Sequence, residues 1–196
     1  MSRRFYAALI AASLFAAVPA SSASDAPTPT ATGTAAVPMA TVWSGDKPPF
    51  GFSGGADSLD ALIDQFLAAV KAGDMDAVQR LRVTKAEYEN IIVPGEAPKG
   101  QPPRQTFQKA NDVFFGMLDS RSRYAAENIV DRFKGKEFVR RELELSKGTR
   151  EFIWFTGRGE VRLTLFDADG NRALLKTGWA AEVDGRYKFI GFNWND

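Results

Sequence analysis

The chain has 196 residues with 25 basic and 24 acidic side chains, and it contains no histidine and no cysteine. It therefore lacks Ser-His-Asp and Cys-His catalytic machinery, classical zinc sites and disulfide bonds. The near-neutral charge argues against general nucleic-acid binding. Carboxylate, lysine, tyrosine and hydroxyl chemistry remains, as does binding without chemistry.

The first 23 residues have the pattern of an export signal. Arg3 and Arg4 precede an apolar stretch from Tyr6 to Val18, and small residues follow up to Ala23. We expect cleavage after Ala23 and a periplasmic or secreted location. The apolar stretch is too short to span a bilayer, so we expect no stable membrane insertion after cleavage. General secretion and twin-arginine export both stay open.

Residues 24–57 are rich in Pro, Thr, Ala, Gly and Ser, a composition typical of a flexible tether. Trp43, Phe50 and Phe52 are exceptions, because aromatic rings in a disordered spacer would expose apolar area without benefit. We expect these rings to dock on the folded domain or on a partner. The domain itself is predicted to cover residues 58–196.

Apolar spacing predicts helices in the first half of this domain. The first helix begins at Asp57-Ser58, ends at Gly73 and buries the face formed by Leu59, Leu62, Ile63, Phe66, Leu67 and Val70. Asp74 begins a second, short helix through Leu81. The capping box of Thr84 and Glu87 opens a third helix, which is expected to stop before Pro94.

A loop over residues 96–104 leads to a longer helical stretch, which Thr106 is expected to cap and Gly135 to close. Its apolar positions include Phe107, Ala110, Phe114, Met117 and Leu118. A break near Ser120 is one alternative.

Alternating apolar and charged residues predict strands after Gly135. Asp169-Gly170 and Asp184-Gly185 have the form of hairpin turns, and the second joins the stretch from Leu174 to Val183 with the last strand. Asp167 to Asn171 lacks the closing acidic residue of a calcium loop and is interpreted as a turn. Helices followed by an antiparallel meander make the fold class α+β.

The last hairpin has a register that its turn defines. Glu182 then lies opposite Tyr187, Ala180 opposite Phe189, and Gly178 opposite Gly191, on a face expected to be hollow. The other face is expected to pack on the helices and carries Leu175, Trp179, Ile190, Phe192 and Trp194. A bulge near Gly191 would swap the outer half of this assignment.

Two segments carry a family resemblance. The stretch from Phe66 to Val78 resembles the amino-terminal helix and Gly-Asp turn of the nuclear transport factor 2-like superfamily, which includes the SnoaL and cystatin-like α+β cones. The stretch from Glu182 to Phe189 resembles its last hairpin. The resemblance covers about residues 58–196 and implies amino-terminal helices packed across a curved antiparallel sheet, forming a cone with a pocket.

The resemblance implies several functions, because this superfamily contains isomerases, dehydratases, epoxide hydrolases, cyclases and non-catalytic binding modules. Its dehydratases use histidine, which this chain lacks. The isomerase and cyclase pattern is an aspartate base with a tyrosine or a second acid in an apolar pocket. No aspartate of this chain matches that pattern.

The candidate site residues follow from the hairpin and the aromatic side chains. Glu182 and Tyr187 are weak candidates for an acid and phenol pair, against the alternative of a structural hydrogen bond at the rim. The candidate ligand-binding residues are Tyr187, Phe189, Trp154, Tyr88 and Arg140. The aromatic residues of this set are also compatible with an ordinary core. Of Arg140 and Arg141, at most one can enter a pocket, because neighbouring strand residues face opposite sides.

The sequence favours a secreted or periplasmic non-catalytic module that binds a small apolar molecule or a protein partner, with no metal and no cofactor. Two alternatives stay open. One is a metal-free, carboxylate-dependent isomerase or cyclase acting on a small hydrophobic substrate. The other is a homo-oligomeric assembly subunit, such as a homodimer formed through the outer sheet face.

Overall fold

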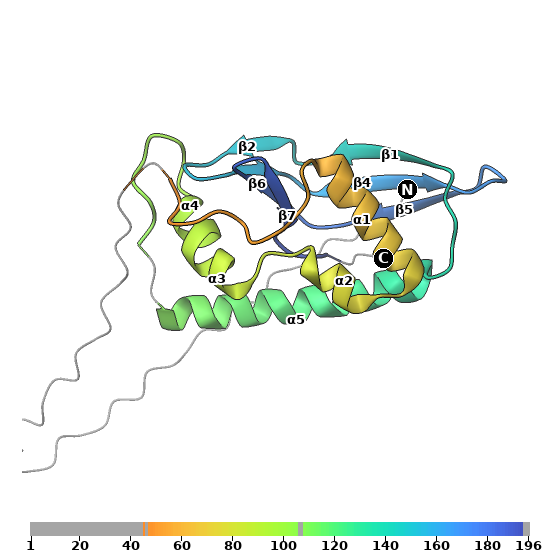
Figure 1. Cartoon of the computed structure of the whole chain (residues 1–196), viewed down its shortest axis with the longest axis horizontal. Coiled ribbons are helices and arrows are strands. Elements are labelled where there is room, and N and C mark those ends of the chain that lie inside the picture. Colours follow the sequence, from red (N-terminus) through yellow and green to blue (C-terminus); the bar gives the residue numbers. More distant parts are fainter. Residues whose placement is uncertain (1–44, 46, 106–107, 194–196) are drawn as a thin grey trace, which may run out of the picture. The chain divides into compact units, whose positions relative to one another are not determined.

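A computed structural model describes residues 45, 47–105 and 108–193 of the chain. The expected signal peptide, its cleavage site, Trp43, Thr106 and Trp194 lie outside these residues. The described part combines helices with antiparallel sheets, as the α+β class requires. Figure 1 shows the long helix α5 running along one side of α2 and α3, with the strands on the opposite side.

The short helices begin where their capping residues predict. Helix α1 (Leu59–Ala72) has Ser58 as its N-cap, whose hydroxyl accepts a hydrogen bond from the Ala61 N–H, and it ends at Gly73 with φ 73°. Helix α2 (Met75–Arg80) has Asp74 as its N-cap. Helix α3 (Lys85–Glu87) has the expected capping box, with Thr84 and Glu87 bonding each other's backbone N–H.

The helix that α3 opens does not stop before Pro94, so that prediction is wrong. A π-helical turn, η1 (Tyr88–Ile92), follows α3, and α4 (Val93–Gly95) follows η1. The Val93 N–H donates to the Tyr88 carbonyl across the wider turn. Pro94 then lies in the first turn of α4, where a missing N–H costs no helical bond.

Helix α5 (Gln108–Phe133) is continuous over 26 residues, so there is no break near Ser120. Its carboxyl-terminal half is the buried part: Ala126, Ile129 and Phe133 are at most 2% exposed and belong to the main core cluster. They pack in the same cluster as Phe66 of α1, which is fully buried. Each large apolar side chain buried in this way contributes about 1.5–3 kcal/mol to folding.

The strands form two antiparallel sheets. One has the order β1-β4-β5 and the other β2-β3-β6-β7. Their bounds are β1 (Arg140–Leu145), β2 (Thr149–Glu151), β3 (Thr156–Arg158), β4 (Val161–Phe166), β5 (Arg172–Lys176), β6 (Ala180–Val183) and β7 (Arg186–Phe189). The expected single strand from Leu174 to Val183 is thus divided between the sheets.

The two sheets are linked at one bend without a change of register. Arg162 pairs with Lys176 in the first sheet and Arg158 with Ala180 in the second. The pairing thus moves four residues back on one strand and four residues forward on the other. Hydrogen bonds continue between the two pairs, from the Thr177 N–H to the Val161 carbonyl over 2.9 Å. A Cβ on Gly178 would overlap the Gly191 carbonyl, so this crossing needs glycine.

The hairpin register is confirmed, since Ala180 pairs with Phe189 and Glu182 with Tyr187. The prediction of a hollow face is wrong. Phe189 is fully buried against Phe66, with 5.4 Å between the ring centroids. Helix α5 covers Gly191, where an added Cβ would lie 2.7 Å from Leu118. Large side chains of α1 and α5 therefore fill the space beside the small strand residues.

The opposite face also differs from expectation. Phe192 stacks on Phe66 with 5.2 Å between centroids, so it lies with Phe189 rather than with Ile190. The alternative, in which the residues after Gly191 swap faces, therefore applies. Regular strand alternation stops there because β7 ends at Phe189. The opposite face has its own smaller cluster of buried residues, formed by Phe52, Val83, Ile91, Ile92, Phe155, Ala181 and Val183.

The segment just before α1 packs onto the domain. Phe52 is 8% exposed within the smaller cluster, which confirms that it docks, whereas Phe50 is 43% exposed. The Ala56 N–H donates to the Tyr187 carbonyl, and the Tyr187 N–H donates to the Ala56 carbonyl. Packed residues thus extend to the amino-terminal side of Ser58.

A buried ion pair joins this segment to α3 and β7. The Lys188 ammonium lies 3.0 Å from both carboxylate oxygens of Glu87, and each side chain is 2% exposed. The Glu87 carboxylate also accepts from the backbone N–H and the hydroxyl of Ser53 and from the Thr84 N–H. Burial raises the pKa of Glu87, but these bonds outweigh it and hold the pKa below its ordinary value.

We expect Glu87→Gln to lower the free energy of unfolding at pH 7 by about 3–5 kcal/mol, because it leaves the Lys188 ammonium buried without a counter-charge. Urea unfolding followed by circular dichroism measures this loss. Glu137→Gln is the matched control. It breaks the exposed pair with Lys71 and should change stability little.

The loss should depend on pH. The stabilisation from a carboxylate with a lowered pKa is present above its unfolded pKa and is lost as the pH falls through its folded pKa. The difference between the wild type and Glu87→Gln should therefore narrow as the pH falls below about 4. A difference that stays constant down to pH 3 would contradict this assignment.

Candidate functional site

A pocket of about 290 Å³ lies between the η1–α4 segment, α5 and the strands of the second sheet. Its volume is close to the lower end of small-molecule sites, which run from about 300 to 1,000 Å³. Its apolar wall consists of Tyr88, Ile92, Val93, Leu118, Phe152, Phe155, Trp179 and Ile190. Glu96, Arg150 and Asn193 are the charged and amide side chains in the wall.

Aromatic rings form the sheet side of this pocket. Phe152 and Phe155 are stacked, with 4.6 Å between centroids and 27° between planes. Trp179 lies against Gly157, where an added Cβ would be 3.2 Å from the indole and 2.9 Å from Phe152. The guanidinium of Arg150 lies 5.4 Å from the Trp179 ring centroid. A flat apolar molecule would therefore meet rings on this wall and one cation near them.

Tyr88 provides a polar atom on the helix side of the pocket. Its ring packs against Phe115 of α5, with 5.5 Å between centroids. Burial, and then the negative charge of Glu96, raise the pKa of Tyr88 above its ordinary value. The phenol is therefore protonated at neutral pH and can donate a hydrogen bond to an acceptor on a bound molecule.

Of the five candidate ligand-binding residues, Tyr88 lines this pocket. Phe189 is fully buried in the main core. Trp154 is 6% exposed, packs on Gly95, and its indole N–H donates to the Gly45 carbonyl over 3.0 Å. Arg140 is exposed on β1 and stacks over Phe166, with 3.9 Å from its guanidinium carbon to the ring centroid.

Tyr187 and Glu182 do lie side by side, but Arg158 joins them. The Arg158 guanidinium is 2.5 Å from the Glu182 carboxylate, and both side chains are about three-quarters buried. Burial raises the pKa of Glu182, but hydrogen bonding to Arg158 and Tyr187 outweighs it, so the pKa is lowered. Burial and then Glu182 raise the pKa of Tyr187. The carboxylate is thus ionised and paired, with its charge already compensated.

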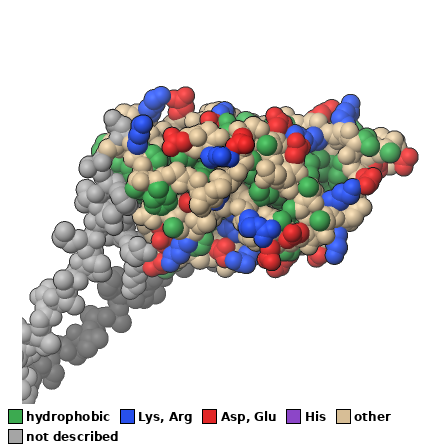
Figure 2. All heavy atoms as spheres, in the orientation of Figure 1, with side chains coloured by type: hydrophobic (Ala, Val, Ile, Leu, Met, Phe, Trp, Pro, Cys, Tyr) green, Lys and Arg blue, Asp and Glu red, His purple; other side chains and the backbone are tan. Residues whose placement is uncertain are grey.

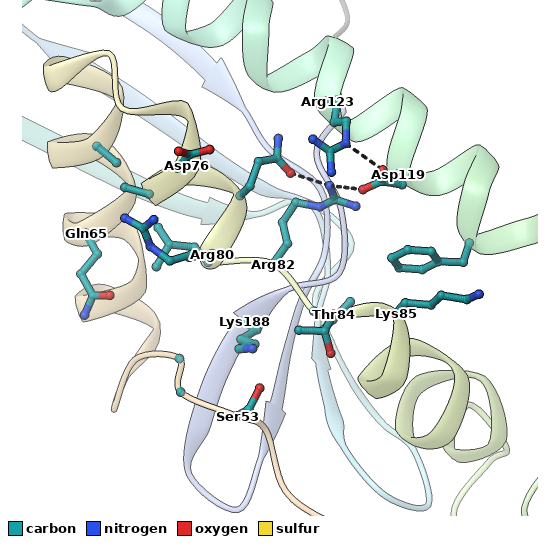
Figure 3. Close-up of a pocket in the computed structure, with 18 of the residues that line it drawn as sticks. Ser53, Gln65, Asp76, Arg80, Arg82, Thr84, Lys85, Asp119, Arg123 and Lys188 are labelled. Atoms are coloured by element: carbon teal, nitrogen blue, oxygen red, sulfur yellow. Dashed lines mark hydrogen bonds and ion pairs between the residues drawn. The ribbon is translucent and has the colours of Figure 1, made fainter. Parts of the chain in front are cut away.

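A larger cleft of about 1,130 Å³ lies elsewhere, between α1, α2 and α5. Figure 3 shows Arg82 directed toward Asp119 and Arg123, while Ser53 and Lys188 lie on another side of the cleft. The lining contains five basic residues, Arg80, Arg82, Lys85, Arg123 and Lys188, and two acidic ones, Asp76 and Asp119. Charged side chains are thus more numerous in the lining of this cleft than in that of the smaller, aromatic pocket.

The described residues contain no group of three or more acidic side chains placed to hold a metal ion. Within the same residues, no helix is long and apolar enough to cross a membrane. Figure 2 shows acidic and basic side chains interspersed over the face it presents.

A scan against models of protein families, a search of curated proteins and a search of solved structures each found no match for this chain. Function is therefore inferred from the side chains that line the pocket and the cleft described above.

Sequence reasoning missed several wall residues. Phe152, Phe155 and Arg150 read as ordinary strand residues, and nothing local to them indicates a pocket. The sequence predicts Trp179 on a face that packs on the helices, and the structure places it in the wall of the pocket. Arg158 was missed because its pairing with Ala180 brings it beside Glu182 only once the sheet is assembled.

We expect Glu182→Gln to lower the free energy of unfolding by about 0.2–1 kcal/mol, because the pair with Arg158 is partly solvated. The loss should shrink as the pH falls through the lowered pKa of Glu182, since the carboxylate becomes neutral there. Urea titrations at pH 7 and pH 3 measure both effects. A variant as stable as the wild type at pH 7 would show that the pair has no structural role.

Proposed function

We propose that this chain is a secreted or periplasmic, non-catalytic module with a nuclear transport factor 2-like cone, which binds a small, largely apolar molecule. The observation that carries the proposal is the aromatic pocket walled by Tyr88, Phe152, Phe155 and Trp179. Its few polar atoms, the Tyr88 hydroxyl among them, would orient a ligand held mainly by ring contacts.

The cone is supported by the sheet. Two strand pairs pass through the bend at Gly178 in one register, and the helices cover the face that carries Ala180 and Phe189. The expected location is supported by the apolar stretch after Arg3 and Arg4, which has the form of an export signal.

Binding is favoured over catalysis by the state of the carboxylates. An isomerase or cyclase of this kind needs an acid or base whose pKa is tuned by an apolar pocket. Glu182 is instead held ionised by Arg158, and it is not part of the aromatic wall. Glu96, the carboxylate in that wall, is exposed.

Native mass spectrometry of residues 24–196, purified gently after export, tests whether a small molecule is retained. We expect a bound mass and a one-to-one complex. Titration with 2-naphthol, a neutral flat probe, should give saturable binding by calorimetry. Leu118→Trp, which fills the pocket, should abolish this binding. Asp131→Trp, which adds the same ring at an exposed position of α5 outside the pocket, should not. Equal binding by both variants would contradict the pocket assignment.

A second candidate function is assembly of two copies through α5. Its outer face exposes four large apolar side chains, at 50–63% of their area: Val113, Phe114, Met117 and Tyr124. Gly116 lies in the same stretch with open space around it, so a second helix could approach closely there. The same face of a second copy would offer the same apolar side chains and the same glycine, so a second copy of this chain is the occupant that fits it.

Analytical ultracentrifugation tests this candidate. We expect a dimer that Met117→Glu converts to a monomer, because a buried unpaired carboxylate would oppose association. Leu174→Glu places the same charge on β5, where Leu174 is 50% exposed, and should leave the dimer intact. Dissociation by Leu174→Glu instead would place the interface on the outer sheet face, and a monomeric wild type at all concentrations would remove the candidate.

A further inference from the structure

Arg82 occupies an unusual position in the larger cleft, because it follows α2 and is only 4% exposed. Its Nη1 donates to the Gln79 side-chain oxygen over 2.7 Å and to an Asp119 carboxylate oxygen over 3.1 Å. Asp119 also accepts from the Nε of Arg123, over 2.8 Å. One carboxylate thus accepts hydrogen bonds from two guanidinium groups, and Asp119, then Glu127 and Asp76, raise the pKa of Arg123.

Three buried donors at this place have no acceptor. They are Nε and Nη2 of Arg82 and the amide nitrogen of Gln79. Unpaired buried donors are rare in folded proteins, since each forfeits its hydrogen bonds to water. A fully buried guanidinium edge with no partner therefore points to an acceptor that fits there.

The positions of the free donors indicate the shape of that acceptor. Nε and Nη2 lie on one edge of the guanidinium, with parallel N–H bonds that match two oxygens of a carboxylate or phosphate. The other side of the group is already held by Gln79 and Asp119. Arg82 is therefore fixed in orientation, with a two-donor edge remaining.

Other charges around the cleft are more fully compensated. Lys85 forms ion pairs with Asp112 and with Glu89, and Lys188 is paired with Glu87. Arg80, which is exposed, lies 3.9 Å from Asp74. Among the described basic side chains of the cleft, Arg82 is the one with unpaired buried donors, and Figure 3 shows it beside Asp119 and Arg123.

We propose that the cleft between α2 and α5 binds the oxyanion of a small molecule, a carboxylate or a phosphate group, on the Nε–Nη2 edge of Arg82. The edge has almost no solvent exposure, so binding includes a local side-chain shift in the cleft wall. This site is separate from the aromatic pocket, and it does not depend on the function proposed for that pocket.

Calorimetric titration of residues 24–196 with inorganic phosphate and, separately, with acetate tests the site, at constant ionic strength set with chloride. We expect one saturable site for one of the two anions, and that anion identifies the ligand group. Arg82→Lys keeps the charge but removes the two-donor edge, so it should weaken binding about tenfold. Arg80→Lys makes the same change at an exposed arginine of the cleft and should leave the affinity within about twofold.

Nitrogen-15 spectra of the arginine Nε–H groups give a readout that does not depend on how well the variants fold. The Arg82 resonance should shift on titration of the wild-type protein, with the same midpoint as the calorimetric curve, while the Arg80 resonance stays in place. Equal affinity in Arg82→Lys, an unmoved Arg82 resonance, or no binding of either anion would each overturn the proposal. In that last case buried water would be what satisfies the donors.

Discussion

The buried pair of Glu87 and Lys188 holds together three parts of the chain that are far apart in sequence. The Glu87 carboxylate caps α3 by accepting a hydrogen bond from the Thr84 N–H, and it also accepts from the N–H and the hydroxyl of Ser53. It neutralises Lys188 of β7, whose side chain is 2% exposed. The partners are 101 residues apart. Burying two charges is costly unless every oxygen has a donor, and here the donors come from three different elements. Removing any one of these elements would leave a buried charge incompletely solvated. The amino-terminal segment, the helices and the last hairpin are therefore mutually dependent, and the pair fixes α3 and η1 against the sheet.

That constraint, together with the bend in the sheet, creates the aromatic pocket. Gly178 lies where the strand pairing passes from the first sheet to the second, and Gly157 leaves room for the Trp179 indole beside β3. Tyr88 and Ile92 lie in η1, directly after the residue that forms the buried pair. The wider π turn changes which side chains face the sheet, as such turns do at many functional sites. The two walls of the pocket are thus held apart by packing and by one ion pair.

Sequence alone predicts the features that depend on neighbours along the chain. Ser58, Asp74 and Thr84 cap helices through bonds three residues away, and Asp184-Gly185 fixes its hairpin through two backbone angles. Prediction from sequence fails where a residue's contact partner is distant along the chain. The residues opposite Phe189 are small, and only the packed structure shows that Phe66 fills the space beside them. Glu87 fits a capping box so well that nothing local reveals its second partner. For the same reason Arg82, an ordinary residue in a charged stretch, gave no signal of unpaired buried donors.

The two cavities share elements, and this has a physical consequence. Leu118 lines the aromatic pocket and Asp119 lines the cleft, so neighbouring residues of α5 face different cavities. Thr84 and Lys85 border the cleft, whereas Tyr88 and Ile92 border the pocket on the same helical segment. A ligand in either cavity therefore contacts both α5 and the segment anchored by Glu87. Two sites are coupled when both ligands shift the position of one shared element. Here the shared elements are α5 and the segment of α3 and η1, and coupling requires that one of them moves. The buried ion pair opposes that motion on the segment side, which leaves α5, with its exposed apolar half, as the element through which the two cavities would communicate.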